Sequence, residues 1–337
     1  MRRILAVYDE DPVYAARFAD VVNGKEKIPF EAVAFSSVEK LDRFAGKYPV
    51  ELLLLGEGAE NGEAERITAT QRVILTGTKK VPQEGKYPCV YKFQSVDAIL
   101  REIMAFCGEQ RGACVEISAG KAAKVIGVFS PLGRCRKTSL AIVLGKLMAQ
   151  DCRTLYLNLE ANSGLSFLTG TEYHRGMSDL LYYWKMGNYN GMRLSSAVYS
   201  MGELDYVPPV RYPEDLEQAG AESLAALIET IAKENDYEIL VIDAGDFRSA
   251  VLPVLAICSV VYMPVLEDRV SAAKLQEFEM YLTKTDNEVL MEKIKRLKLP
   301  EPVGFMGKDN YIDQLLWGEL GDYVRQFLRG GKADCGE

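Results

Sequence analysis

The residues with the clearest chemical potential lie in one stretch, residues 124–150. An apolar run at residues 125–129 is followed by turn formers, and Lys137 and Thr138 then open a segment whose apolar residues recur at helical spacing. A strand, a turn, Lys-Thr and a helix in this order form the frame of a phosphate-binding loop. The helix N-terminus in such a frame presents unpaired backbone N–H groups to an anion. The stretch therefore predicts a phosphate-binding site.

The residues retained in this loop each have a defined use. Lys137 is expected to hold the β- and γ-phosphates of ATP, Thr138 to offer its hydroxyl to Mg²⁺, and Ser139 to contact the α-phosphate. Further along the chain, residues 237–243 form an apolar run that ends in Asp243. Such a run is the pattern of a strand that presents a carboxylate to Mg²⁺. Thr138 and Asp243 are therefore the candidate metal ligands.

Other positions of the loop depart from the usual residues. On the KGGxGKTT frame of MinD/ParA ATPases, which this stretch resembles, Gly133 matches the first glycine, whereas Arg134 and Arg136 replace the second and the last glycine. A Cβ at position 136 crowds a backbone that must approach phosphate closely, and a positive φ there costs a non-glycine residue ~1–2 kcal/mol. Guanidinium groups, in contrast, bind phosphate oxygens directly. Two hypotheses stay open: these three residues bind nucleotide together with the rest of the loop, or the loop is a vestige whose arginines form surface salt bridges.

The loop resembles the deviant KGGxGKTT form that marks the MinD/ParA class of dimerising ATPases. In that comparison Leu132 stands at the signature lysine, and Asn158 and Glu160 stand at two aspartates of a switch strand, residues 154–159. The resemblance implies a homodimer that binds ATP and Mg²⁺. Because the signature lysine stabilises the leaving phosphate, its loss implies weak hydrolysis at most, with Glu160 as the candidate catalytic residue. The alternative is an active ATPase of this class that drives a positioning or partitioning cycle.

The first part of the chain carries a second pattern. Apolar runs alternate with helical patterns over roughly a hundred residues, which predicts a doubly wound α/β domain of flavodoxin-like order. Strands are expected at residues 3–8, 30–35, 50–55, 72–75 and 89–93, and helices from Pro12, at 38–46 and at 95–107.

This first domain resembles the receiver domain of two-component regulators. The residues that match the receiver's Mg²⁺-binding acidic pair, its threonine and its lysine are Asp9 and Asp11 (or Glu10), Thr76 and Lys92. The phosphate-accepting aspartate is replaced by Gly56, and the adjacent Glu57 is expected to point elsewhere. Without that carboxylate no acyl phosphate can form, so the resemblance implies a pseudo-receiver that docks partners. Alternatively, the acidic run at residues 9–11 is only a solvated helix start, favoured by the helix macrodipole.

The chain as a whole is predicted to be α/β, with two doubly wound domains. Residues 1–109 form the flavodoxin-like pseudo-receiver, 110–122 a linker, 123–330 a MinD/ParA-like P-loop NTPase domain with a mostly parallel sheet, and 331–337 a tail. Further strands of the second domain are expected at 204–209 and 259–265, and further helices at 223–233, 270–282 and 312–328.

This architecture, together with the motifs at residues 130–133 and 156–160, resembles the TadZ/CpaE proteins of tight-adherence (Tad) pilus systems. The resemblance implies a scaffold or localisation protein that acts as a dimer and recruits proteins of a pilus or secretion assembly. It also implies a position at a cell pole, peripheral to the inner membrane through those partners.

Composition limits the other possibilities. The net charge is −8 and the pI is near 5.1. These values argue against non-specific binding of nucleic acid, which normally requires a basic face. No apolar run approaches the ~18 residues of a membrane span, so no direct membrane insertion is expected. Seven scattered cysteines without a CxxC pair predict a cytoplasmic protein without a zinc site or disulfides. The single histidine, His174, and the basic run at 293–298 are expected to be solvated, and the helix at 312–328 to pack on the sheet.

Overall fold

The computed structural model describes residues 3–25, 28–59, 63–78, 86–109, 122–245, 251–301 and 311–332. The chain divides into two compact units, Met1–Ala113 and Cys114–Glu337, and each unit has its own β-sheet. The predicted linker at 110–122 lies, except for Ala122, outside the described residues, as does most of the predicted tail.

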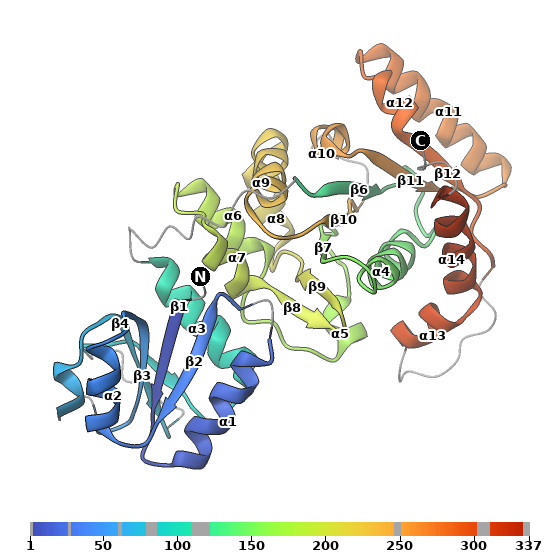
Figure 1. Cartoon of the computed structure of the whole chain (residues 1–337). Coiled ribbons are helices and arrows are strands. Elements are labelled where there is room, and N and C mark those ends of the chain that lie inside the picture. The colour runs from blue at the N-terminus through green and yellow to red at the C-terminus, as the bar shows by residue number, and fades with distance from the viewer. Residues whose placement is uncertain are drawn as a thin grey trace. The chain divides into compact units, whose positions relative to one another are not determined.

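Within its described residues, the N-terminal unit forms a five-stranded parallel sheet in the order β2-β1-β3-β4-β5 (Figure 1). The strands are β1 (Arg3–Tyr8), β2 (Phe30–Phe35), β3 (Val50–Gly56), β4 (Ala69–Thr76) and β5 (Cys89–Tyr91). This strand order is that of flavodoxin-like doubly wound sheets. The central strand β3 has four consecutive fully buried leucines, residues 52–55, because a parallel strand of this kind is covered on both faces.

The helices of this unit are α1 (Pro12–Asn23), α2 (Val38–Ala45) and α3 (Val96–Glu109), with a 3-10 helix at Glu63–Arg66. Helix α1 begins at Pro12, as predicted. Its N-cap is Asp11, whose carboxylate accepts the backbone N–H groups of Val13 (2.9 Å) and Tyr14 (3.2 Å). Asp11 thus satisfies two of the donors that a helix start leaves unpaired.

The described residues of the C-terminal unit form a seven-stranded sheet in the order β12-β11-β6-β10-β7-β9-β8 (Figure 1). The strands are β6 (Lys124–Val128), β7 (Thr154–Asn158), β8 (Tyr199–Met201), β9 (Leu204–Val207), β10 (Ile239–Asp243), β11 (Val260–Pro264) and β12 (Ile294–Leu297). All neighbours are parallel except β8 and β9. The prediction of a mostly parallel sheet is confirmed.

Helices cover both faces of this sheet. They are α4 (Lys137–Met148), α5 (Leu165–Thr169), α6 (Met177–Lys185), α7 (Gly191–Ala197), α8 (Pro213–Ala219), α9 (Ala221–Glu234), α10 (Val251–Ile257), α11 (Arg269–Lys284), α12 (Val289–Lys293), α13 (Tyr311–Trp317) and α14 (Glu319–Lys332). Helices α4, α13 and α14 share an apolar core with one face of the sheet, and α6 to α12 pack on the other face (Figure 1).

Two parts of the sequence prediction for this unit were wrong in detail. The helix expected at 312–328 is two helices, α13 and α14, which break at Gly318 and still pack on the sheet. A Cβ at Gly318 would lie 2.6 Å from the carbonyl oxygen of Gln314, and one at Gly321 would lie 1.8 Å from that of Leu316, so this corner needs both glycines. The basic run at 293–298 contains an edge strand, β12, instead of only a solvated face.

The chain leaves the two central strands β6 and β10 in opposite directions. Helix α4 leads from β6 to β7, beyond β10, whereas α10 leads from β10 to β11, beyond β6. In open α/β sheets the crevice outside the carboxyl ends of strands at such a switch point is where ligands bind. The topology therefore places the loop after β6 and the end of β10 at the position expected for a site.

Candidate phosphate-binding site

The backbone of the loop between β6 and α4 is left-handed at both arginine positions. Arg134 and Arg136 both have positive φ, 58° and 67°, and Arg136 is the left-handed N-cap of α4. These are the two positions where glycine was expected, and each left-handed non-glycine residue costs ~1–2 kcal/mol. Turns with left-handed residues direct backbone N–H groups toward an anion. The loop thus has a left-handed backbone at two positions that carry arginine instead of glycine.

The side chain of Lys137 folds back over this loop. It is 6% exposed, and its Nζ donates to the carbonyl oxygen of Leu132 at 3.1 Å. Leu132 itself is buried in the apolar core, and its N–H donates to the hydroxyl of Ser130. The position that resembles a signature lysine therefore packs inward and presents no cation.

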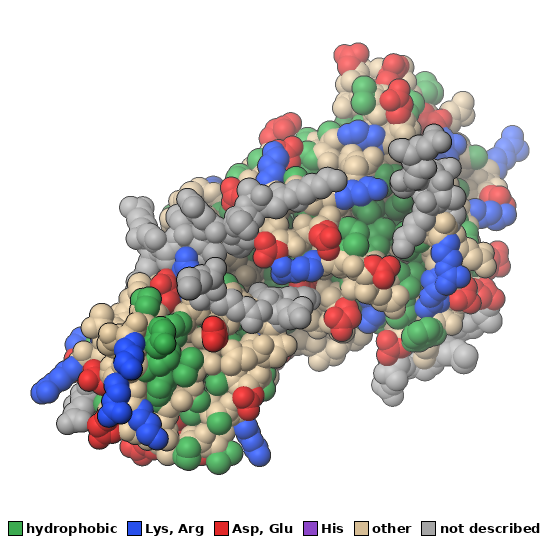
Figure 2. All heavy atoms as spheres, viewed as in Figure 1, with side chains coloured by type: hydrophobic (Ala, Val, Ile, Leu, Met, Phe, Trp, Pro, Cys, Tyr) green, Lys and Arg blue, Asp and Glu red, His purple; other side chains and the backbone are tan. Residues whose placement is uncertain are grey.

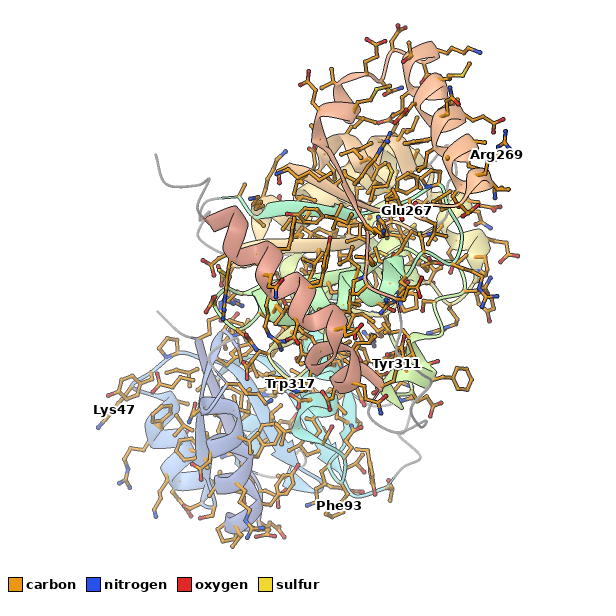
Figure 3. The ribbon with its side chains drawn as sticks, turned by 90° about the vertical axis from the view of Figure 1, so that its right-hand side faces the viewer. Lys47, Phe93, Glu267, Arg269, Tyr311 and Trp317 are labelled. Atoms are coloured by element: carbon orange, nitrogen blue, oxygen red, sulfur yellow. The ribbon has the colours of Figure 1, made fainter. Side chains whose placement is uncertain are left out.

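The two arginines have different surroundings. The guanidinium of Arg136 donates to the carbonyl oxygen of Pro300, in the segment that follows β12. Arg134 is exposed. The hydroxyl of Ser139 lies 3.3 Å from that of Tyr311, which Figure 3 labels at the start of α13. Arg136 and Ser139 thus join the loop to residues far away in the sequence, and only Arg134 directs its charge to solvent.

Asp243 ends β10 and is the centre of the candidate metal site. In the sheet register it lies beside Val128 of β6 and Asn158 of β7, and it is fully buried. Its Oδ2 accepts a hydrogen bond from the hydroxyl of Tyr156 at 3.3 Å. Its Oδ1 is buried and has no hydrogen-bond partner among the residues that the structure describes. A buried oxygen left unpaired costs free energy unless something satisfies it.

The electrostatic setting of Asp243 agrees with a bound cation. Burial raises the pKa of this carboxyl above its usual value. The Thr138 hydroxyl, the Gly245 N–H, the Lys137 ammonium and the Tyr156 hydroxyl act in the opposite direction and lower that pKa. Mg²⁺ prefers carboxylate and hydroxyl oxygens and keeps several of its waters. Asp243 and Thr138 therefore fit Mg²⁺, which when bound beside phosphate would neutralise part of its charge.

The two candidate residues at and just after the end of β7 have different surroundings. Asn158 is fully buried, its Nδ2 donates to the Tyr156 hydroxyl at 2.8 Å, and its Oδ1 accepts the Glu160 N–H at 2.9 Å. Both ends of the Asn158 amide are thus engaged in hydrogen bonds. Glu160 is half-buried just beyond the strand. Tyr156 was missed by the sequence analysis. Its signal was a tyrosine two residues before Asn158, on the same face of an otherwise apolar strand.

The N-terminal unit brings its own polar residues together at the carboxyl ends of its strands. Lys92 pairs with the buried Asp9 at 3.1 Å, and a Cβ at Gly56 would lie 3.1 Å from Asp9 Oδ2. Glu57 was expected to point elsewhere. Instead, its Oε2 accepts hydrogen bonds from the Thr76 hydroxyl at 3.0 Å and from the Gly77 N–H at 2.8 Å, at the same edge. These residues share one edge of the sheet, and the matching of this unit to a receiver stays a prediction.

The remaining predicted features are quickly placed. His174 is exposed in the turn before α6. On the face shown in Figure 2, acidic and basic side chains are intermingled over both units. Among the helices that the structure describes, none combines the length and apolar character needed to cross a membrane.

Comparisons with known proteins give structural neighbours only. No protein-family model matches the chain, and no curated protein matches it. A plasmid partition protein from Borrelia burgdorferi bound to AMPPNP is 15% identical, with a TM-score of 0.44 over 60% of this chain and 99% of its own. An ATP complex of Cyanothece McdA is 17% identical, with a TM-score of 0.43 over 58% of this chain and 78% of its own.

A third neighbour is the septum site-determining protein MinD of Pyrococcus horikoshii with Mg-ADP. It is 15% identical, with a TM-score of 0.41 over 58% of this chain and 76% of its own. These proteins are of the class that the loop resembles. Because every TM-score is below 0.5 and every identity is below 25%, they establish neither a ligand nor an activity for this chain.

Proposed function

We propose that this chain binds ATP with Mg²⁺ at the β6–α4 loop and hydrolyses it slowly, so that it acts as a nucleotide-held scaffold. The observation that carries the proposal is the buried carboxylate of Asp243, whose Oδ1 is unpaired beside Lys137 and Thr138. A lysine and a hydroxyl at the start of a helix, and a carboxylate with a spare oxygen at the end of a strand, are the groups that a Mg²⁺-nucleotide requires.

Several features argue for slow hydrolysis. Phosphoryl transfer depends on positive charge at the transferred group, and Leu132 supplies none because its side chain is uncharged. Arg136 already uses one of its N–H groups on the Pro300 carbonyl oxygen, so fewer of its donors are left for phosphate. Asn158 uses its amide within the sheet. Glu160 is then the candidate for orienting a water molecule, and the alternative of an active positioning ATPase depends on it.

The scaffold role and the pilus assignment belong to the same proposal. The N-terminal unit has Gly56 at the edge where its acidic, hydroxyl and ammonium groups meet, so it lacks the carboxylate of a phospho-switch. A unit of this kind serves docking. With the resemblance to TadZ/CpaE, this favours a dimeric scaffold that recruits Tad-type pilus proteins at a cell pole. Neighbouring genes for a pilin, a secretion ATPase or a prepilin peptidase would support it, and their absence from every genome that carries the chain would contradict it.

Calorimetric titration with ATP and Mg²⁺ tests the nucleotide site. Lys137→Ala should abolish binding, whereas Lys146→Ala should not, since Lys146 lies on the same helix and donates to the Met201 carbonyl oxygen instead. Steady-state phosphate release should stay near background. Absence of ATP binding to the wild type would refute the site. If the wild type hydrolyses ATP rapidly and Glu160→Gln does not, the hypothesis of an active ATPase replaces that of the scaffold.

A further inference from the structure

Behind the candidate metal site lies a chain of hydrogen bonds made by fully buried groups. Tyr156, Asn158 and Asp243 each have 0% exposure. The Tyr156 hydroxyl donates to Asp243 Oδ2 at 3.3 Å and accepts from Asn158 Nδ2 at 2.8 Å. Asn158 Oδ1 accepts the backbone N–H of Glu160 at 2.9 Å. The chain therefore runs from the carboxylate at the end of β10 to the backbone that follows β7.

The donors and acceptors of this chain have only one consistent direction. A backbone N–H can only donate, so the Glu160 N–H fixes which end of the Asn158 amide faces it. The amide nitrogen must then face Tyr156, whose hydroxyl accepts that bond and has its proton left for Asp243.

We propose that Tyr156 is a positioning residue that holds Asp243 Oδ2, leaves Oδ1 for the cation, and couples cation binding to the backbone at Glu160. This inference rests on the proposed function. Two strands carry the coupled groups, since Asn158 and Asp243 are register partners on β7 and β10. Partners that orient a metal ligand contribute strongly to metal affinity.

The same geometry explains why residue 158 is an asparagine. An ionised aspartate there would only accept hydrogen bonds, so it could not donate to the Tyr156 hydroxyl. It would also place a second carboxylate beside the buried Asp243. Asn158 thus leaves the proton of the Tyr156 hydroxyl for Asp243, which an ionised aspartate at this position would not do.

The test compares Tyr156→Phe with Tyr206→Phe in the full chain. Tyr206 is the register partner of Tyr156 on β9, is also buried, and donates its hydroxyl to Tyr173 instead of Asp243. ATP affinity is measured by calorimetry in EDTA and over a Mg²⁺ series. We expect Tyr156→Phe to lower the Mg²⁺ affinity about 10-fold or more with ATP affinity in EDTA unchanged. Tyr206→Phe should change neither.

Hydrogen exchange of the segment 158–164, with and without Mg²⁺-ATP, tests the coupling. Protection on Mg²⁺-ATP binding should appear in the wild type and in Tyr206→Phe and be absent in Tyr156→Phe. If Tyr156→Phe does not fold, Asn158→Leu, which removes the middle of the chain, should show the same loss of protection. Equal Mg²⁺ affinity or equal protection in wild type and variant overturns this inference alone. Absence of ATP binding to the wild type overturns the proposed function, and this inference with it.

Discussion

The left-handed backbone of the β6–α4 loop predicts which of two variants of Arg134, to glycine or to alanine, is the more stable. Arg134 has a φ of 58° and an exposed side chain, so Arg134→Ala removes the side chain but keeps the Cβ that this conformation disfavours. Arg134→Gly removes both. The difference in stability between these two variants therefore isolates the backbone conformation at residue 134.

The magnitude follows from two opposing contributions. Loss of the Cβ from a left-handed residue relieves ~1–2 kcal/mol. Glycine gives back ~0.4–1 kcal/mol because it increases the conformational entropy of the unfolded chain. Arg134→Gly should thus exceed Arg134→Ala by about 0.5–1 kcal/mol in the free energy of unfolding. With about 2–4 °C for each kcal/mol in a domain of this size, the Tm should rise by about 1–4 °C.

Tryptophan fluorescence suits the measurement, because both tryptophans of the chain, Trp184 and Trp317, belong to the C-terminal unit. Their emission during thermal or urea unfolding reports on the unit that carries the loop. In an ordinary right-handed conformation glycine is less stable than alanine by ~0.5–1 kcal/mol. A glycine variant less stable than the alanine variant would therefore refute the left-handed backbone and the phosphate-loop geometry that depends on it.

Two further predictions concern the buried carboxylate and the helix corner. Since burial raises the pKa of Asp243 in the folded protein, the folded state binds the proton more tightly than the unfolded state. We expect urea titrations without Mg²⁺ to show that the free energy of unfolding of the wild type falls, relative to that of Asp243→Asn, as the pH rises above about 4. A relative free energy of unfolding that rises with pH would exclude a buried charge at Asp243. Gly321→Ala should lower the free energy of unfolding by about 2–3 kcal/mol, since its Cβ would meet the Leu316 carbonyl oxygen. Gly133→Ala, with open space around it, serves as the near-neutral control. Equal melting temperatures of the two variants would rule out the close corner.

Much of the fold was predictable because its signals are local. The strands of the N-terminal unit, the start of α1 at Pro12 and the β6–loop–α4 frame follow from apolar periodicity and from residues suited to turns and helix starts. Two short edge strands were not predicted. Strand β12 spans four residues of a basic run, and β8 spans three, so neither offers enough alternation to separate it from a loop. The break lies at Gly318, where a Cβ would meet the Gln314 carbonyl oxygen, and a helical pattern does not contain such a contact.

The sequence by itself determined which residues are candidates for binding phosphate and magnesium, because Lys137, Thr138 and Asp243 are marked by residue type and by their place after strands. Only the tertiary structure decided what surrounds them. Arg136 meets Pro300 at a separation of 164 residues, and Tyr156 meets Asp243 at a separation of 87. Such pairs depend on strand order and register, which bring distant segments together, and hydrogen-bond direction is then fixed by the donors and acceptors that happen to meet.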